Sequence, residues 1–373
     1  MKLGIVCYPT HGGSGVIASE LALGLAERGH EIHIVSYATP FRLRTFHQNV
    51  FIHEVEVASY PLFKYPPYAL SLATKLVDVA KEYNLDLIHA HYAVPHAAST
   101  YLAKKMLRSQ SLKTVTTLHG TDITLVGMDK SFCQVVRFNI EESDGVTAVS
   151  SYLQQRTIQE FQIRQEIRVI HNFVNTQTYR PDSNPSMRDH FAPQGEKIMM
   201  HASNFRPVKR VKDILYAFAK IRKKIPAKLL LVGEGPDRPA VQQLVETLKL
   251  SEDVFFLGEQ DYMERLISCA DIFMLTSEQE SFGLVALEAQ SCAVPVLGTA
   301  VGGLPEVIAN GKSGYLVPVG DTTAIADKAL ELLGDEKLLS AFQECARQRA
   351  IDLFDSRRII PRYESFYEEI LTT

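Results

Sequence analysis

Short apolar runs alternate with longer stretches of helical periodicity along the whole of this chain. The first run, residues 2–8, is apolar almost throughout, as expected for a strand of a parallel sheet that is buried on both faces. Strands that alternate with helical patterns indicate βαβ units. A stretch rich in Pro, Asp, Ser and Asn, Tyr179–Gly195, predicts a linker, and a length of 373 residues favours two domains. The sequence therefore predicts an α/β chain with similar strand-and-helix patterns in its two halves.

The overall charge and the cysteines narrow the classes of function. The formal net charge is −4, so we expect no large basic surface for nucleic acid. The five cysteines form no C-x-x-C pair, which fits reduced thiols in the cytoplasm. Residues 1–9 resemble a first strand more than a signal peptide, and no apolar run reaches the length of a membrane span. We therefore expect a cytoplasmic protein.

The stretch Ser277–Pro295 holds two glutamates, Glu280 and Glu288, eight positions apart. A buried strand is predicted just before it, and Gly283 suits a tight entry into an apolar helix. The free N–H groups of a helix N-terminus favour a phosphate. With one glutamate in the loop and the other two turns into the helix, the carboxylates lie roughly 10–12 Å apart, enough for a diphosphate with a sugar at each end. The alternative is a surface loop followed by a core helix with an incidental glutamate.

A glycine turn follows the first strand. Gly13, Gly15 and Ala18 match G-x-G-x-x-A, the pattern of dinucleotide-binding turns. The second strand, Glu31–Tyr37, lacks the terminal acidic residue that would bind the ribose of NAD. This turn contains no G-K-[ST] sequence, so it is not a P-loop. We interpret the glycines as a place where the backbone approaches some other ligand closely.

Histidines gather in the first half of the chain. His89, His91 and His96 have spacings that could bind a metal, but no carboxylate or cysteine completes a ligand set. His119-Gly-Thr-Asp122 directly follows the predicted strand Lys113–Leu118. A histidine at the carboxyl end of a strand faces the crevice where open α/β sheets bind ligands. The alternative is a histidine that caps the next turn.

The second half carries a cationic loop after its first strand. Ser203–Arg210 holds three cations within five positions, Arg206, Lys209 and Arg210, which could neutralise a diphosphate. A solvated basic loop is the alternative. A second glycine turn, Gly233-Glu-Gly235-Pro, follows the next strand.

Taken together, the E-x7-E pair, the G-E-G-P turn, the cationic loop and H-G-T-D resemble the retaining nucleotide-sugar glycosyltransferases of family 4. The resemblance covers nearly the whole chain. It implies an α/β fold of the GT-B type, with two Rossmann-like domains facing each other across a deep cleft. The implied divisions are an acceptor domain over residues 1–170, a donor domain over 171–354, and a helix over 355–373 that crosses back to the first domain. Apolar residues recur every three or four positions in that last segment, as an amphipathic helix requires.

Within the family, five stretches are similar to enzymes that transfer N-acetylglucosamine from UDP-GlcNAc to L-malate, the first step of bacillithiol synthesis. They are CYPTHGGSGVIASELALGLAERGHEIH, PFRL, HAHYAVPHA, TTLHGTD and SNFRPVKRV. The resemblance implies UDP as product and a homo-oligomer. There is no D-x-D motif, so we expect no metal ion and no other cofactor.

Two rival interpretations stay open. Other members of the family act on inositol phosphates or membrane lipids, and a lipid acceptor predicts an exposed basic helix. Ala97–Arg108 is a candidate for that helix, although a solvated helix end explains its lysines equally well. The second rival is a non-catalytic protein that binds a nucleotide sugar or NAD. Retention of His119 and Glu280 argues against it.

The resemblance also implies the site residues. The catalytic set is His119, Arg206, Lys209 and Glu280. The donor-binding set is Gly13, Ser14, Gly233, Gly235, Gln260, Phe282, Gly283, Leu284 and Glu288, and the acceptor-binding candidates are Ser14, Tyr92, Thr121 and Arg137. The chain departs from the family at Asn204, where most members have an arginine five residues before the phosphate-binding lysine. Arg206 is our candidate to supply that charge.

Overall fold

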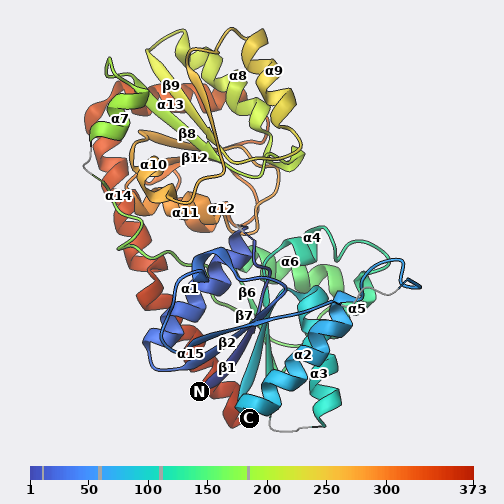
Figure 1. Cartoon of the computed structure of the whole chain (residues 1–373). Coiled ribbons are helices and arrows are strands. Elements are labelled where there is room, and N and C mark those ends of the chain that lie inside the picture. Colours follow the sequence, from blue (N-terminus) through green and yellow to red (C-terminus); the bar gives the residue numbers. More distant parts are fainter. Residues whose placement is uncertain (11, 58–60, 109–111, 183–184) are drawn as a thin grey trace. The chain divides into compact units, whose positions relative to one another are not determined.

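The computed structural model describes residues 1–373 apart from residue 11 and residues 58–60, 109–111 and 183–184. The chain divides into two compact units. Unit 1 comprises Met1–Asn172 together with Ser356–Thr373, and unit 2 comprises Phe173–Asp355. Figure 1 shows a sheet with helices against it in each unit. Within the described residues, no helix is both long enough and apolar enough to span a membrane.

Unit 1 is built on a seven-stranded parallel sheet in the order β3-β2-β1-β4-β5-β6-β7. Its strands are β1 (Lys2–Val6), β2 (Glu31–Ser36), β3 (Val50–Glu54), β4 (Leu87–His91), β5 (Lys113–Leu118), β6 (Gly145–Ala148) and β7 (Ile167–Val169). The central strands are buried, which explains their unbroken apolar runs.

The helices of unit 1 include one from the far end of the sequence. They are α1 (Gly13–Glu27), η1 (Phe41–Leu43), α2 (Tyr68–Tyr83), η2 (Ala93–Ala97), α3 (Ala98–Leu107), α4 (Thr121–Thr124), α5 (Cys133–Glu141), α6 (Ser151–Phe161) and α15 (Ser356–Thr372). The predicted apolar stripe of α15 is real, because Ile359, Ile360, Tyr363, Phe366 and Tyr367 are all buried.

Helix α15 packs against α1 and β5. Glycines make room for it. A Cβ on Gly24 would lie 2.2 Å from Cδ1 of Ile360, and a Cβ on Gly145 would lie 2.8 Å from Cζ of Phe366. The last helix of the chain is therefore an integral part of unit 1.

Unit 2 contains a six-stranded parallel sheet in the order β10-β9-β8-β11-β12-β13. Its strands are β8 (Lys197–Ala202), β9 (Ala227–Val232), β10 (Val254–Gly258), β11 (Ile272–Leu275), β12 (Val296–Thr299) and β13 (Gly314–Val317). Its helices are α7 (Pro185–Phe191), η3 (Pro207–Lys209), α8 (Val211–Arg222), α9 (Arg238–Thr247), α10 (Met263–Ser268), α11 (Leu284–Ser291), α12 (Leu304–Val307), α13 (Thr322–Gly334) and α14 (Glu336–Phe354). Its hydrophobic core includes Leu229, Leu231, Ile214, Phe218 and Ile325.

The predicted linker at Tyr179–Gly195 is wrong. The structure divides the units at Asn172 and Phe173 and forms α7 inside the Pro-rich stretch. Arg188 anchors that stretch to unit 2, with Nη1 donating to the carbonyl of Cys269 at 2.7 Å and Nη2 donating to Asp271 at 2.9 Å. These long-range bonds hold α7 on unit 2, although the composition of the stretch is that of a linker.

Each sheet has one place where its strand order changes direction, between β1 and β4 in unit 1 and between β8 and β11 in unit 2. Open α/β sheets bind ligands at the carboxyl ends of the strands at such a point. The glycine turn after β1 and the H-G-T-D loop after β5 lie at this end of the first sheet. The cationic loop after β8 and the Glu280 loop after β11 lie at the corresponding end of the second.

Candidate active site

In unit 2 the cationic loop and the first glutamate of the E-x7-E pair meet. Nζ of Lys209, at the end of η3, forms an ion pair with the carboxylate of Glu280. The hydroxyl of Ser277 donates to the same carboxylate oxygen at 2.8 Å. The two charged side chains are only 21% and 13% exposed, so the ion pair is partly desolvated. The ammonium of Lys209 and a carboxylate that can accept hydrogen bonds from hydroxyl groups are therefore held side by side at the ligand-binding end of this sheet.

Hydrogen bonds to backbone carbonyl groups also hold the same two loops together. The hydroxyl of Thr276 donates to the carbonyl groups of Lys209 and Arg210, both at 3.1 Å. The N–H of Glu278 donates to the carbonyl of Val208 at 2.8 Å. The loop after β8 is therefore fixed on the loop after β11, independently of the ion pair.

The G-E-G-P turn lies against the start of the cationic loop. Gly233 has φ 110°, and a Cβ there would lie 1.9 Å from the carbonyl oxygen of Ser203. Gly235 has φ 155°, and its Cβ would lie 1.9 Å from the carbonyl oxygen of Asn204. Both positions therefore require glycine, and what the motif provides in this structure is close contact between two loops.

A second glycine pair, which the sequence pattern did not assign to the site, supports Glu280. A Cβ on Gly302, at φ 57°, would lie 1.7 Å from the carbonyl oxygen of Glu280. The N–H of Gly303 donates to that oxygen at 2.9 Å. The adjacent glycines at 302 and 303 were the available signal, but their partner lies too far away in sequence to be inferred from spacing.

Gly283 is the N-cap of α11 and has φ 93°, the tight entry that the sequence predicted. Glu288 lies on α11 and is 9% exposed, so its carboxylate is largely buried. Phe282 is buried against the ring of Phe354, at 5.7 Å between centroids, and Leu284 opens the helix half-buried. The N–H groups at the start of α11 point out of the N-terminal end of the helix, as helix geometry dictates.

The remaining predicted residues of unit 2 are exposed. Arg206 and Asn204 lie in the loop after β8, and Arg206 makes no ion pair with any residue that the structure describes. Gln260 bonds the carbonyl of Leu257 at 2.6 Å. Arg206 is therefore available for an anionic ligand, whereas Lys209 must exchange or share its bond to Glu280 with one.

A buried histidine of unit 2 was missed by sequence reasoning. Nδ1 of His201, on β8, donates to the carbonyl of Met274 on β11 at 2.8 Å. Its Nε2 bonds the hydroxyl of Ser203 at 2.8 Å. Burial lowers the pKa of His201 to about 4, so the ring is neutral and acts as a bridge between the strand ends. A single histidine inside an apolar run gives no sequence signal for that role.

In unit 1, Asp122 organises the H-G-T-D loop. One oxygen of its carboxylate accepts from the N–H of Gly120 at 2.8 Å and from that of His119 at 3.3 Å. The other accepts from the N–H of Ala93, beyond the end of β4, at 3.0 Å. Burial raises the pKa of Asp122 to about 6, and the backbone donors oppose that rise. Asp122 thereby ties the ends of β4 and β5 together and places His119.

His119 contacts a second histidine. Its Nε2 lies 2.8 Å from Nδ1 of His91, the last residue of β4. Burial lowers the pKa of His119 to about 3 and that of His91 well below its usual value, so both rings are neutral at pH 7. No group of three or more potential ligands that could hold a metal ion occurs among the described His, Cys, Asp and Glu residues.

Comparison with known proteins agrees with this geometry. The family described as Glycosyltransferase Family 4 matches residues 11–178, and Glycosyl transferases group 1 matches residues 182–349. N-acetyl-alpha-D-glucosaminyl L-malate synthase of Bacillus anthracis is 48% identical over 372 residues, which span 100% of this chain and 97% of the relative. The chain belongs to glycosyltransferase family 4.

Solved structures place this family 4 glycosyltransferase in the predicted fold class. A glycosyltransferase from Rickettsia africae superposes with a TM-score of 0.83 at 25% identity, covering 99% of this chain and 98% of the other. Alr3699/HepE of Anabaena, in complex with UDP and glucose, gives a TM-score of 0.85 at 21% identity and 99% coverage of both chains. The prediction of two Rossmann-like domains and of a glycosyltransferase is confirmed.

The acceptor candidates of this glycosyltransferase are placed unequally. The ring of Tyr92 lies 5.3 Å from that of His119, and Tyr92 holds a strained φ of 94°, as residues at functional sites often do. Thr121, two residues after His119, begins α4 and is exposed. Ser14 lies in the first turn of α1, beside the exposed Gly13, and Arg137 is half-buried on α5. The structure thus brings Tyr92 to His119, and it shows no bond from Ser14 or Arg137 to that histidine among the described residues.

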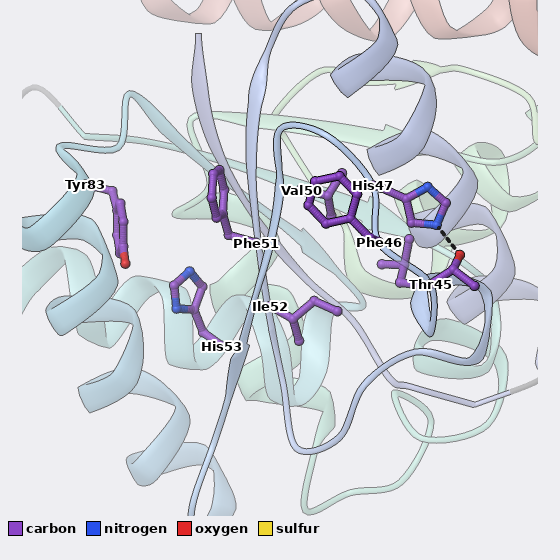
Figure 2. A pocket seen from close by; sticks show the side chains of 9 residues that line it. Thr45, Phe46, His47, Val50, Phe51, Ile52, His53 and Tyr83 are labelled. Atoms are coloured by element: carbon purple, nitrogen blue, oxygen red, sulfur yellow. Dashed lines mark hydrogen bonds between the residues drawn. The ribbon is translucent and has the colours of Figure 1, made fainter.

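A hollow on unit 1 lies elsewhere, on the edge strand β3 and the loop before it (Figure 2). Its volume is about 480 Å³, and it is lined by Leu43, Thr45, Phe46, His47, Val50, Phe51, Ile52, His53 and Tyr83. The lining contains no lysine, arginine or carboxylate, and burial lowers the pKa of His53 to about 4. This hollow offers no lysine or arginine to a diphosphate and includes none of the predicted site residues.

Proposed function

We propose that this glycosyltransferase moves N-acetylglucosamine from UDP-GlcNAc to the hydroxyl of L-malate with retention of the anomeric configuration, as the first step of bacillithiol biosynthesis. The observation that carries the proposal is the 48% identity, over the whole chain, to a protein named for that reaction. The paired Lys209 and Glu280 support it, because they provide a cation for a diphosphate and an acceptor for sugar hydroxyls.

The diphosphate of the donor binds on unit 2 without a metal ion. Lys209 and the exposed Arg206 supply positive charge, and the N-terminus of α11 after Gly283 supplies oriented N–H groups. These fixed donors stabilise the charge that develops on the leaving phosphate as the bond to the sugar breaks. The absence of a D-x-D sequence supports a metal-independent site.

The two glutamates recognise the ends of the donor. Glu280, held by Ser277 and by the backbone at Gly303, accepts from hydroxyls of the transferred sugar. Glu288 accepts from the diol of the ribose. The donor set is completed by the glycine turns at Gly13, Gly233 and Gly235 and by Ser14, Gln260, Phe282 and Leu284.

The chemical step needs no protein nucleophile. The bond between the anomeric carbon and the phosphate oxygen breaks, and the malate hydroxyl oxygen bonds to the same face of that carbon. The hydroxyl proton passes to the departing phosphate, so the products are the glycoside and UDP. His119 holds the 6-hydroxyl of the sugar and thereby keeps the anomeric carbon in position.

L-malate is a dianion at neutral pH and needs fixed donors. The candidates are Tyr92, whose ring lies 5.3 Å from that of His119, Thr121, two residues after that histidine, and Ser14 and Arg137. The lipid alternative is weakened by α3, where the ammonium of Lys104 is paired with Asp144 at 2.6 Å and is therefore engaged within the protein.

The stereochemistry of the product tests the proposal. The protein is incubated with UDP-GlcNAc and L-malate, and the anomeric proton of the product is observed by NMR. We expect an α-glycoside to appear in step with UDP and to be absent when malate is omitted. A β-glycoside, or free N-acetylglucosamine as the sole sugar product, would refute the proposed reaction.

A further inference from the structure

The contact between His91 and His119 joins two adjacent strands of the unit 1 sheet. His91 is the last residue of β4, and His119 follows the end of β5. In the parallel register His91 lies beside Thr117, two residues before His119. The two imidazoles are 5.0 Å apart between centroids, and Nδ1 of His91 lies 2.8 Å from Nε2 of His119.

Only one proton can lie between these two nitrogens. Both rings are neutral because burial lowers both pKa values, so each ring carries a single N–H. If His91 donates from Nδ1, then His119 accepts at Nε2 and must carry its own proton on Nδ1. If His119 donates from Nε2, the protons of both rings are on Nε2, and Nδ1 of His119 is an acceptor.

The far nitrogen of His91 distinguishes these two states. Nε2 of His91 is buried and has no hydrogen-bond partner among the described residues. In the second state this nitrogen would be a buried N–H without an acceptor, which proteins rarely tolerate. In the first state Nε2 of His91 carries a lone pair and no proton, so no buried N–H is left without an acceptor.

A neighbouring histidine shows that this pocket tolerates an unpaired lone pair. Nδ1 of His96 bonds the carbonyl of His91, and a carbonyl can only accept, so the proton of His96 is on Nδ1. Its Nε2 is then a lone pair, and it too is buried without a partner among the described residues. The first state of the pair gives His91 the same arrangement, a buried Nε2 that carries a lone pair and has no hydrogen-bond partner in the part of the chain that the structure describes.

We infer that His91 is a positioning residue that holds the proton of His119 on Nδ1. His119 then presents an N–H donor to its ligand. The hydrogen bond to His91 uses Nε2 of His119, and the half-buried ring leaves Nδ1 open to a ligand. The inference rests on the proposed function only for the identity of that ligand, which is an oxygen of the donor sugar.

The tautomer is measured directly on the full-length protein. Histidine labelled with ¹⁵N gives long-range proton–nitrogen NMR spectra in which the two neutral tautomers differ, and the spectrum of His119→Ala assigns the signals of residue 119. We expect a protonated Nδ1 at His119 in the protein without substrate. A protonated Nε2 would overturn the inference without affecting the proposed reaction.

Two variants of nearly equal shape test the consequence. His91→Asn keeps an N–H donor near the position of Nδ1, whereas His91→Leu removes it. We expect His91→Leu to lower kcat about two- to tenfold, the effect of one ordinary hydrogen bond, with UDP affinity unchanged, and His91→Asn to retain most activity.

Equal losses in both variants would show that His91 merely fills space and would overturn its role. If the tautomer of His119 changes in His91→Leu and neither variant loses activity, the inferred role of His91 stands and the proposed role of His119 in holding the sugar fails. The two failures are therefore distinguishable.

Discussion

Replacing Lys209 with Met removes the ammonium and keeps the length of the side chain. In the proposed mechanism this ammonium faces the leaving diphosphate. Loss of one preorganised donor of that kind lowers kcat by about 10²–10³, or about 2.7–4 kcal/mol of transition-state stabilisation. The ion pair with Glu280 is lost as well, but the carboxylate keeps its bond from Ser277 and remains partly exposed. We therefore expect the free energy of unfolding to fall by about 1–3 kcal/mol.

The assay is continuous detection of UDP release at saturating UDP-GlcNAc and L-malate, with thermal unfolding measured on the same samples. Lys212→Met is the matched control, because Lys212 is exposed on α8 and makes no ion pair with a described residue. The control should behave as wild type. If Lys209→Met keeps more than about a tenth of the wild-type kcat while folded, the ammonium does not act on the leaving group and the reasoning is refuted.

Three further outcomes follow from the same structure. His119→Ala should lower turnover far more than it weakens UDP binding, because UDP lacks the sugar that His119 holds; equal losses, by kinetics and calorimetry, would make His119 a nucleotide-site or structural residue. EDTA should leave activity unchanged, and a loss that Mg²⁺ or Mn²⁺ restores would contradict the metal-independent site. Gly302→Ala should lower the free energy of unfolding, measured with denaturant, by about 1–3 kcal/mol or more. The residue is held at φ 57°, and the new Cβ would meet the carbonyl oxygen of Glu280. Gly334→Ala is the control and should have little effect, because a Cβ there has open space around it.

Local patterns predicted the elements well. The apolar run at residues 2–8, the position of His119 at the end of β5 and the helix entry at Gly283 all follow from periodicity and glycine placement within a few residues. The stripe on α15 is likewise a local pattern. Such features depend on neighbours in the sequence, which is why a single sequence suffices for them.

The contacts that build the site could not be predicted in this way. Lys209 and Glu280 are 71 residues apart, and they meet because β8 lies beside β11 in the sheet. The supports at Gly302 and His201 depend on the same strand order. The misassigned linker has a similar cause, because the bonds of Arg188 reach residues more than 80 positions away.

The acceptor is the central claim, and a comparison of acceptors with the same donor tests it most directly. The protein is supplied with UDP-GlcNAc and, separately, with L-malate, other hydroxy acids, inositol phosphate or lipid vesicles, and kcat/KM for UDP release is compared. We expect L-malate to exceed every other acceptor by at least about a hundredfold, since a site that bonds both carboxylates leaves donors unpaired with the wrong acceptor. Preferred use of inositol phosphate or of a lipid, with L-malate inert, would contradict the account.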